Sequence, residues 1–199
     1  MTLPTISEGT DPKSVRKGVS VQAPQAVAWR GFTEKMGALW PQAYCKIGKA
    51  NAVDAVIEPR AGGCRYERGD DGNTCQWGNV LVWEPHSRLV LSWDIGADWQ
   101  YDPTLKTEIK VRFNTDGSER TRVELEHRHL DRYGSRRDEM RRIFDSEGDW
   151  GKLLEMFARV AAEAQGGKEH VGVWQRSVQN GPFAECQGSG HRIPGRRFA

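Results

Sequence analysis

The feature that most constrains this sequence is a wide apolar stripe in the segment 149–165. The apolar residues of this segment recur at helical spacing: Trp150, Leu153, Leu154, Phe157, Val160, Ala161 and Ala164. Charged residues occupy the opposite side, and two glycines follow at 166 and 167, where a helix commonly ends. An amphipathic helix with so broad an apolar face has to be covered, so the rest of the chain must supply an apolar surface for it.

A series of short strands before the helix supplies that surface. We expect a strand at 14–23, a helix that begins at Pro24 and ends at Gly37, and then strands at 53–58, 64–67, 74–84, 88–95, 107–113 and 121–129. The last two strands alternate apolar and charged residues about an Asp116-Gly117 turn. Such consecutive hairpins indicate an antiparallel sheet with one wet face. The prediction is therefore an α+β fold in which a curved antiparallel sheet grips the long C-terminal helix.

One strand has a less regular pattern, and a short helix comes late in the chain. Simple alternation in 74–84 places Cys75, Trp77, Asn79, Leu81 and Trp83 on one face, with Val80 and Val82 on the other. Residues 138–144 are expected to form a short helix before the last one.

Length and charge bound the organisation and the partners of the chain. With 199 residues and a formal net charge of +2, we expect one domain at 14–165, a flexible arm at 1–13 and a flexible basic tail at 166–199. The charge balance does not favour a nucleic-acid partner, and no apolar run reaches membrane-spanning length. The four cysteines (Cys45, Cys64, Cys75 and Cys186) lack metal spacing and are interpreted as reduced thiols, which predicts a cytoplasmic protein.

Several short motifs, taken in order, resemble a known family. They are Ala23-Pro24 with Val27-Ala28-Trp29, Trp40-Pro41, the turn 58–63, the strand pair 78–93, the segment 121–127, Asp149-Trp150 and Leu153-Leu154. Together they resemble the SRPBCC (START/Bet v1-like) superfamily, and within it the domain named after the activator of the heat-shock protein ATPase. The resemblance covers residues 14–165. It implies a helix-grip (Bet v1-like) fold, often with a cavity between the sheet and the helix.

That cavity is the first candidate site. Its predicted lining consists of large or polar residues that alternation mostly turns inward: Tyr66, Trp77, Asn79, Trp93, Phe113, His127, Trp150 and Phe157. The alternative is that these side chains simply fill the core, as aromatic stripes usually do. In the first case an apolar small molecule of moderate size binds there.

His127 and the basic tail are weaker candidates. His127 lies on the apolar side of its strand, where it is either a structural residue or a general base oriented by a carboxylate such as Glu58. No nucleophile or metal motif accompanies it, so no catalytic residue, cofactor or metal is predicted. The arginines of the tail, Arg192, Arg196 and Arg197, are either a phosphate-binding group or ordinary solvated chain.

Three classes of function follow from this sequence. The first is a binding module for an apolar small molecule. The second, implied by the family resemblance alone, is a co-chaperone-like partner of a heat-shock ATPase. The third is a cyclase- or hydrolase-like enzyme, by analogy with other proteins of this fold. A homodimer is left open as the assembly state.

Overall fold

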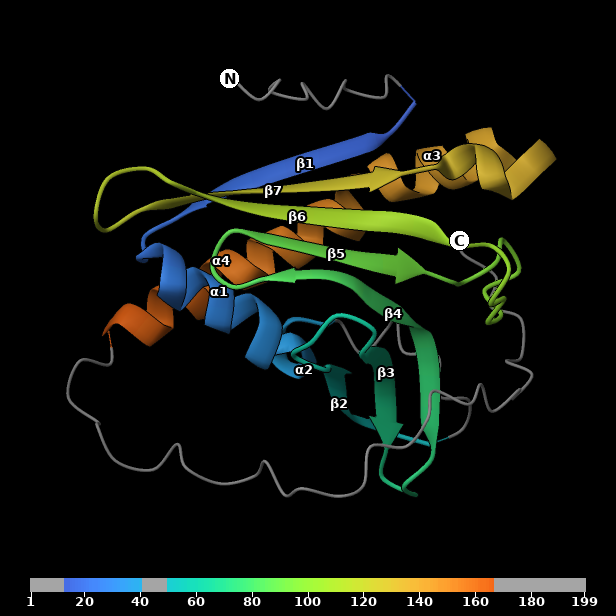
Figure 1. Cartoon of the computed structure of the whole chain (residues 1–199), viewed down its shortest axis with the longest axis horizontal. Coiled ribbons are helices and arrows are strands. Elements are labelled where there is room, and N and C mark those ends of the chain that lie inside the picture. The colour runs from blue at the N-terminus through green and yellow to red at the C-terminus, as the bar shows by residue number, and fades with distance from the viewer. Residues whose placement is uncertain (1–12, 41–49, 167–199) are drawn as a thin grey trace, which may run out of the picture.

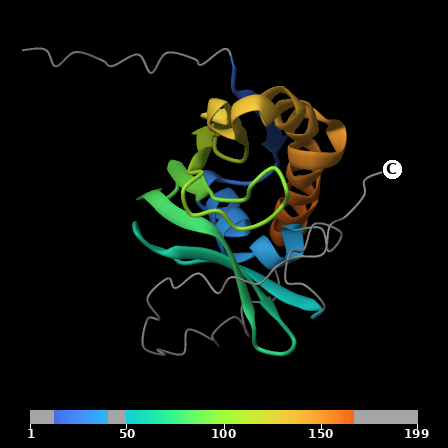
Figure 2. The same cartoon turned by 90° about the vertical axis from the view of Figure 1, so that its right-hand side faces the viewer.

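Seven strands form one antiparallel sheet in the part of the chain that the computed structural model describes, residues 13–40 and 50–166, with side chains to Ala162. The spatial order is β1-β7-β6-β5-β4-β3-β2. The strands are β1 (Val15–Val21), β2 (Ala52–Ile57), β3 (Cys64–Gly69), β4 (Thr74–Glu84), β5 (Arg88–Trp93), β6 (Thr107–Thr115) and β7 (Thr121–Arg128). The sheet curves, and the helices stand on its concave side (Figures 1 and 2).

The helical elements lie at the two ends of the described chain. They are α1 (Gln25–Glu34), α2 (Met36–Leu39), the 3₁₀ segment η2 (Leu130–Arg136), α3 (Arg137–Asp145), the π turn η3 (Glu147–Gly151) and α4 (Lys152–Gly166). Pro24 is the N-cap of α1, as its fixed φ favours at a helix start. The expectation that Gly37 closes the first helix is wrong, because Gly37 lies within α2. This arrangement is the predicted α+β helix-grip fold.

The apolar face of α4 lies against the concave face of the sheet, as predicted. Leu153, Leu154, Phe157 and Ala161 are each no more than 3% exposed, while Glu155 on the other side is exposed. The Phe157 ring packs edge-to-face on Phe32 of α1, with ring centroids 5.4 Å apart. The core is therefore a sandwich of helix α4, helix α1 and the sheet.

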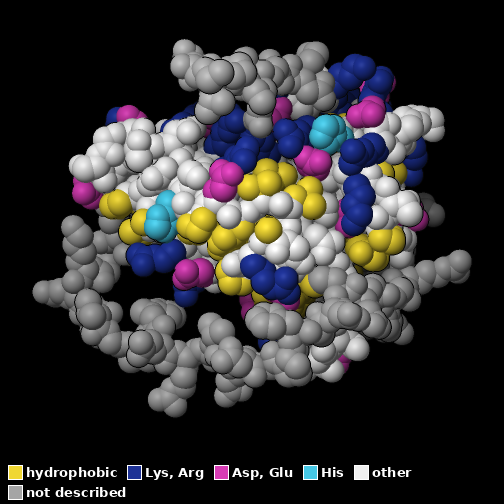
Figure 3. Space-filling model, viewed as in Figure 1, with side chains coloured by type: hydrophobic (Ala, Val, Ile, Leu, Met, Phe, Trp, Pro, Cys, Tyr) yellow, Lys and Arg dark blue, Asp and Glu magenta, His cyan; other side chains and the backbone are white. Residues whose placement is uncertain are grey.

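The β6–β7 hairpin has the regular alternation that the sequence indicates. Ile109 pairs with His127, Val111 with Leu125 and Phe113 with Val123, and all six side chains are buried. Charged side chains of β1, β6 and β7 occupy the outer face, including Arg16 bound to Glu126 and Arg128 bound to Glu108 (Figure 3). One side of the sheet is thus packed and the other is wet.

Strand β4 departs from simple alternation, so the predicted division of its faces is wrong. Its register shifts opposite Arg65 on one side and at Leu81 on the other. As a result Val80 is 1% exposed and Leu81 is 43% exposed, the reverse of the expectation. A β-bulge adds one residue to one strand, and every later side chain then changes face.

The described residues test the predictions about the cysteines and about the domain boundaries only in part. Cys64 is disulfide-bonded and Cys75 is a free thiol, so the prediction of reduced thiols is wrong at Cys64. Cys45 and Cys186 lie outside the described residues, as do most of the predicted arm (1–13) and nearly all of the predicted tail (166–199). No helix of the described chain is long and apolar enough to cross a membrane.

Substitution of Phe157 tests whether α4 is the element on which the core depends. Phe157→Ala should lower the free energy of unfolding by about 3–5 kcal/mol, because it leaves a cavity against Phe32 and the sheet. Glu155→Ala, on the exposed face of the same helix, is the control and should change stability by less than about 0.5 kcal/mol. Urea denaturation followed by circular dichroism measures both, and equal effects of the two variants would contradict the packing described here.

Candidate functional site: a tryptophan-lined cavity

A cavity of about 500 Å³ opens between the end of β5, the loop that follows it and the α3–α4 region. Its wall is mostly apolar. The lining residues are Trp40, Trp93, Trp99, Glu139, Arg142, Ile143, Ser146, Gly148, Asp149, Trp150 and Leu153. The volume lies within the range of small-molecule sites in proteins, about 300–1,000 Å³.

Four tryptophans give the cavity its shape. Trp93 and Trp150 meet nearly at right angles, with centroids 5.4 Å apart, and Trp40 lies 6.3 Å from Trp150. Trp99 comes from the loop after β5 and packs edge-on against Phe144 of α3. The backbone of Trp99 has φ +63°, a left-handed conformation that is unusual for a bulky residue. Such conformations persist only where the surrounding structure holds them in place.

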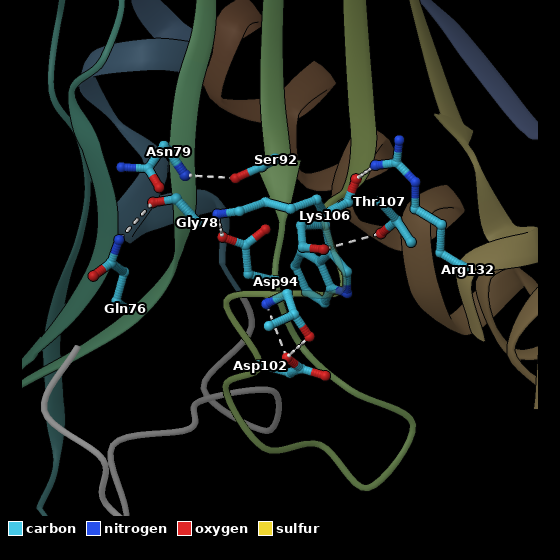
Figure 4. A network of polar contacts seen from close by, with 11 residues as sticks. Gln76, Gly78, Asn79, Ser92, Asp94, Asp102, Lys106, Thr107 and Arg132 are labelled. Atoms are coloured by element: carbon cyan, nitrogen blue, oxygen red, sulfur yellow. Dashed lines mark hydrogen bonds and ion pairs between the residues drawn. The ribbon is translucent and has the colours of Figure 1, made fainter. Parts of the chain in front are cut away.

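Hydrogen bonds across the base of that loop hold it in place (Figure 4). Lys106 Nζ binds the Asp94 carboxylate at 2.7 Å, and the Asp102 backbone N–H donates to the Asp94 carbonyl at 2.7 Å. Asp102 in turn accepts hydrogen bonds from the backbone N–H and the hydroxyl of Thr104. Burial raises the pKa of Asp94, and the hydrogen bond from Lys106 opposes that rise. The loop that carries Trp99 is therefore a fixed wall of the cavity.

Three charged residues border the apolar cavity. Glu139 is bound by Arg136 through two hydrogen bonds of 2.5 and 2.8 Å, which lower the pKa of the Glu139 carboxyl. Asp149 lies at the turn into α4 and is engaged by another group of the protein. Arg142 donates from Nε to the carbonyl of Asp138 at 3.2 Å, and among the described residues no carboxylate forms an ion pair with it. Arg142 is thus the cation at the cavity without an ion-pair partner.

His127 is a structural residue in the core behind the cavity. The Trp150 indole N–H donates to His127 Nδ1 at 3.2 Å, so the ring proton is on Nε2. That N–H donates to the Thr107 hydroxyl at 2.9 Å, and the hydroxyl donates to the Trp93 carbonyl at 3.0 Å. Burial, assisted by the charge of Arg65, lowers the pKa of His127 to about 3.

The general-base role considered for His127 is not supported by this geometry. The ring is 0% exposed, both nitrogens have partners, and His127 does not line the cavity. The suggested partner Glu58 accepts hydrogen bonds from the Cys64 backbone and from Arg60 instead.

Arg65 is a feature that the sequence analysis missed. Its guanidinium is 2% exposed and lies over the rings of Trp77, Trp93 and Trp40, at 4.8, 5.1 and 5.7 Å from their centroids. Nε and Nη1 have no hydrogen-bond partner within the described residues. Burial lowers the pKa of Arg65 to about 9, while nearby Asp94 and Glu67 oppose that shift. Arg65 therefore stays charged at neutral pH behind the tryptophan wall. The sequence analysis turned Tyr66 inward, which by alternation would place its neighbour Arg65 on the outer face of β3, whereas the structure buries Arg65.

Two of the eight predicted lining residues, Trp93 and Trp150, line the cavity. The other six do not appear in its wall. His127, Trp77, Phe113 and Phe157 are buried in the core, and Tyr66 and Asn79 are half-buried on β3 and β4. Of the remaining residues of the wall, Leu153 belongs to the predicted apolar face of α4. The others come from segments where no strand alternation applies: the end of α2, the loop of Trp99, and α3 with the turn after it.

The described residues contain no set of side chains that could bind a metal ion. Within 13–40 and 50–166, no group of three or more His, Cys, Asp or Glu side chains is placed to hold a metal ion. The chemistry available at the cavity is therefore that of indole rings, one unpaired guanidinium and two carboxylates.

A curved antiparallel sheet that holds a C-terminal helix, with a cavity beside that helix, defines a helix-grip protein of the SRPBCC class. Within this class, residues 22–162 match the family described as Activator of Hsp90 ATPase homolog 1-like protein, and the chain belongs to that family. A comparison with curated proteins found no match.

Solved structures of the same fold match most of this chain. An anthrahydroquino-γ-pyrone synthase, Txn09, is 33% identical with a TM-score of 0.53, over 75% of this chain and 99% of that one. CalC, a self-sacrificing resistance protein from Micromonospora echinospora, is 29% identical with a TM-score of 0.59, over 78% and 97%. The Aha1 dimer from Colwellia psychrerythraea has 13% identity and a TM-score of 0.52, over 76% and 98%, and shows the fold alone.

The neutral, buried state of His127 predicts a specific dependence of stability on pH. The pKa of His127 is about 3 in the folded protein and about 6.5 in the unfolded chain, so the unfolded chain binds the extra proton as the pH falls below 6.5. The stabilisation is complete above about pH 6.5 and is lost progressively toward pH 3. The stability difference between the parent and His127→Gln should therefore shift by roughly 2 kcal/mol against the parent between pH 7 and pH 5.

Urea denaturation at a series of pH values measures this difference. Phe144→Leu is the control, since Phe144 packs on His127 with centroids 4.3 Å apart but carries no titrating group. Its stability cost should be the same at both pH values. A His127→Gln cost that also stays constant with pH would mean that folding does not lower the pKa of His127.

Proposed function

We propose that this protein binds a flat aromatic small molecule in the tryptophan-lined cavity. The observation that carries the proposal is the cavity itself, about 500 Å³ with four indole side chains in its wall. An apolar pocket with a few polar groups is the usual form of a small-molecule site. This narrows the apolar ligand expected from the sequence to an aromatic one.

The arrangement of the indoles supports an aromatic occupant. Trp93 and Trp150 stand at 78° to each other, so a planar ligand that stacks on one ring presents its edge to the other. Both arrangements are favourable for aromatic pairs, at about 0.5–1.5 kcal/mol each beyond the burial of apolar area. The fixed loop that carries Trp99 provides a preformed wall, which reduces the entropy lost on binding.

The synthase relative favours a second candidate, an enzyme acting on the bound aromatic molecule. Its name describes a product built on an anthrahydroquinone, which is a polycyclic aromatic, and it is 33% identical over nearly its whole length. In this chain such chemistry would depend on Glu139, Arg142 and Asp149, since His127 is out of reach of the cavity. Glu139 is bound by Arg136 and Asp149 interacts with another group of the protein, so both carboxylates would have to be tested for acid–base work.

The remaining expectations stay predictions. A co-chaperone-like role has the family description in its favour, and the dimeric Aha1 structure is too distant in sequence to transfer its assembly. The cytoplasmic location was inferred from reduced thiols, and the disulfide at Cys64 removes part of that argument.

Filling the cavity tests the proposal. Neutral 2-(hydroxymethyl)anthracene should quench the tryptophan fluorescence of the parent protein with a saturable dependence on concentration. Ile143→Trp places a larger side chain in the cavity wall from a half-buried position on α3, and should weaken binding by tenfold or more. Leu81→Trp is the matched control, because it adds the same indole at an exposed site on β4 that does not line the cavity.

The control should bind like the parent, and both variants should keep the parent's circular dichroism spectrum. If the parent shows no saturable quenching, or if Ile143→Trp binds as well as Leu81→Trp, the cavity is not the binding site.

A further inference from the structure

The charges around the cavity carry information about the ligand beyond its aromatic character. Arg142 is an exposed residue of α3 at the edge of the mostly apolar cavity, and among the described residues it forms no ion pair with a carboxylate. A guanidinium presents several N–H donors in a planar fork, which matches a carboxylate or a phenolate. Its single hydrogen bond, to the Asp138 carbonyl, uses Nε and leaves the terminal nitrogens available.

The acidic groups near Arg142 form their ion pairs and hydrogen bonds with other residues. Asp138 is bound by Arg137 at 2.8 Å, and both Glu139 oxygens are held by Arg136. Asp149 also borders the cavity and is engaged by another group of the protein. Asp138 and Glu139 attract Arg142 electrostatically, but their ion pairs are with Arg137 and Arg136, so among the described residues Arg142 forms no ion pair of its own.

A second cation lies behind the tryptophan wall. The Arg65 guanidinium contacts the faces of Trp93 and Trp40, both of which line the cavity. Two carboxylates, Asp94 and Glu67, balance the positive charges of Arg65 and Lys106. Of these four groups, Arg65 is the one that contacts the rings of Trp93 and Trp40. A cation against one face of an indole lowers the attraction of the opposite face for another cation. Arg65 therefore disfavours a cationic ligand.

We propose that the ligand is an acidic aromatic molecule, whose rings lie among Trp93, Trp99 and Trp150 while its carboxylate or phenolate binds Arg142. This inference rests on the proposed function and adds that the aromatic ligand carries a negative charge. The anionic group would displace water from the Arg142 guanidinium and accept a charge-assisted, bidentate hydrogen bond from it at the edge of an apolar site. The protein should accordingly discriminate between aromatic molecules of one shape by the sign of their charge.

Three anthracenes of matched shape test this selectivity: anthracene-2-carboxylate, 2-(hydroxymethyl)anthracene and 2-(aminomethyl)anthracene, which is a cation at pH 7. Tryptophan quenching at pH 7 gives the three dissociation constants. In the parent protein the carboxylate should bind about tenfold more tightly than the alcohol, and the ammonium compound should bind most weakly. Raising the salt concentration should weaken binding of the carboxylate and leave binding of the alcohol nearly unchanged.

Variants of α3 assign the selectivity to one residue. Arg142→Gln should remove the preference for the carboxylate and keep the affinity for the alcohol within about twofold. Arg142→Lys retains the charge without the planar fork and should keep part of the preference. Arg141→Gln is the control, because Arg141 is exposed on the same helix and does not line the cavity. It should behave like the parent.

The outcomes separate this inference from the proposal on which it rests. If none of the three compounds binds, the proposed function fails. If the three bind with equal affinity, or if Arg142→Gln keeps the preference, the cavity binds aromatics but Arg142 does not select an anion.

Discussion

The structure depends on the burial of one face of α4 against the concave side of the sheet. Each of the buried leucine and phenylalanine side chains on that face contributes about 1.5–3 kcal/mol through removal from water. One helix cannot fill the hollow of a seven-stranded curved sheet, so α1, with Trp29 and Phe32, fills one end. At the other end α3, the turn after it and the end of β5 enclose the cavity. The core and the candidate site are thus consequences of the same curvature.

Polar groups inside this core are held by chains of hydrogen bonds. The relay from Trp150 through His127 and Thr107 to the Trp93 carbonyl satisfies both histidine nitrogens, and it holds the Trp150 indole and the backbone of Trp93, two residues of the cavity wall. Unsatisfied, such groups would each cost about 1–3 kcal/mol. Arg65 is the contrasting case, because two of its nitrogens face aromatic rings and have no hydrogen-bond partner in the described chain. Attraction to the indole faces and to Asp94 and Glu67 compensates part of its desolvation. Histidine and arginine therefore act here as supports of the cavity wall.

The sequence predicts the fold better than the site, for physical reasons. Period-2 alternation in β6 and β7 and the helical spacing of α4 report local geometry, so the elements and the inward positions of Trp93 and Trp150 followed from them. The faces of β4 did not, because two register shifts that depend on its neighbours reset the alternation. The cavity wall also includes Trp99 and Arg142, from a loop and a short helix that meet β5 only in the folded chain. No periodicity within either segment reveals that meeting.

The turn at Asp149 has a further consequence for the way in which the cavity is bounded. Its φ and ψ of −108° and −110° interrupt the helical backbone, so α3 and α4 are separate rods joined at a corner. The sheet and α4 form the rigid frame, and the far side of the hollow belongs to α3 and the corner itself. The side of the cavity formed by α3 and this corner therefore takes no part in the hydrogen bonding between strands. Substitutions there can alter the width of the cavity while the pairing of the sheet stays intact.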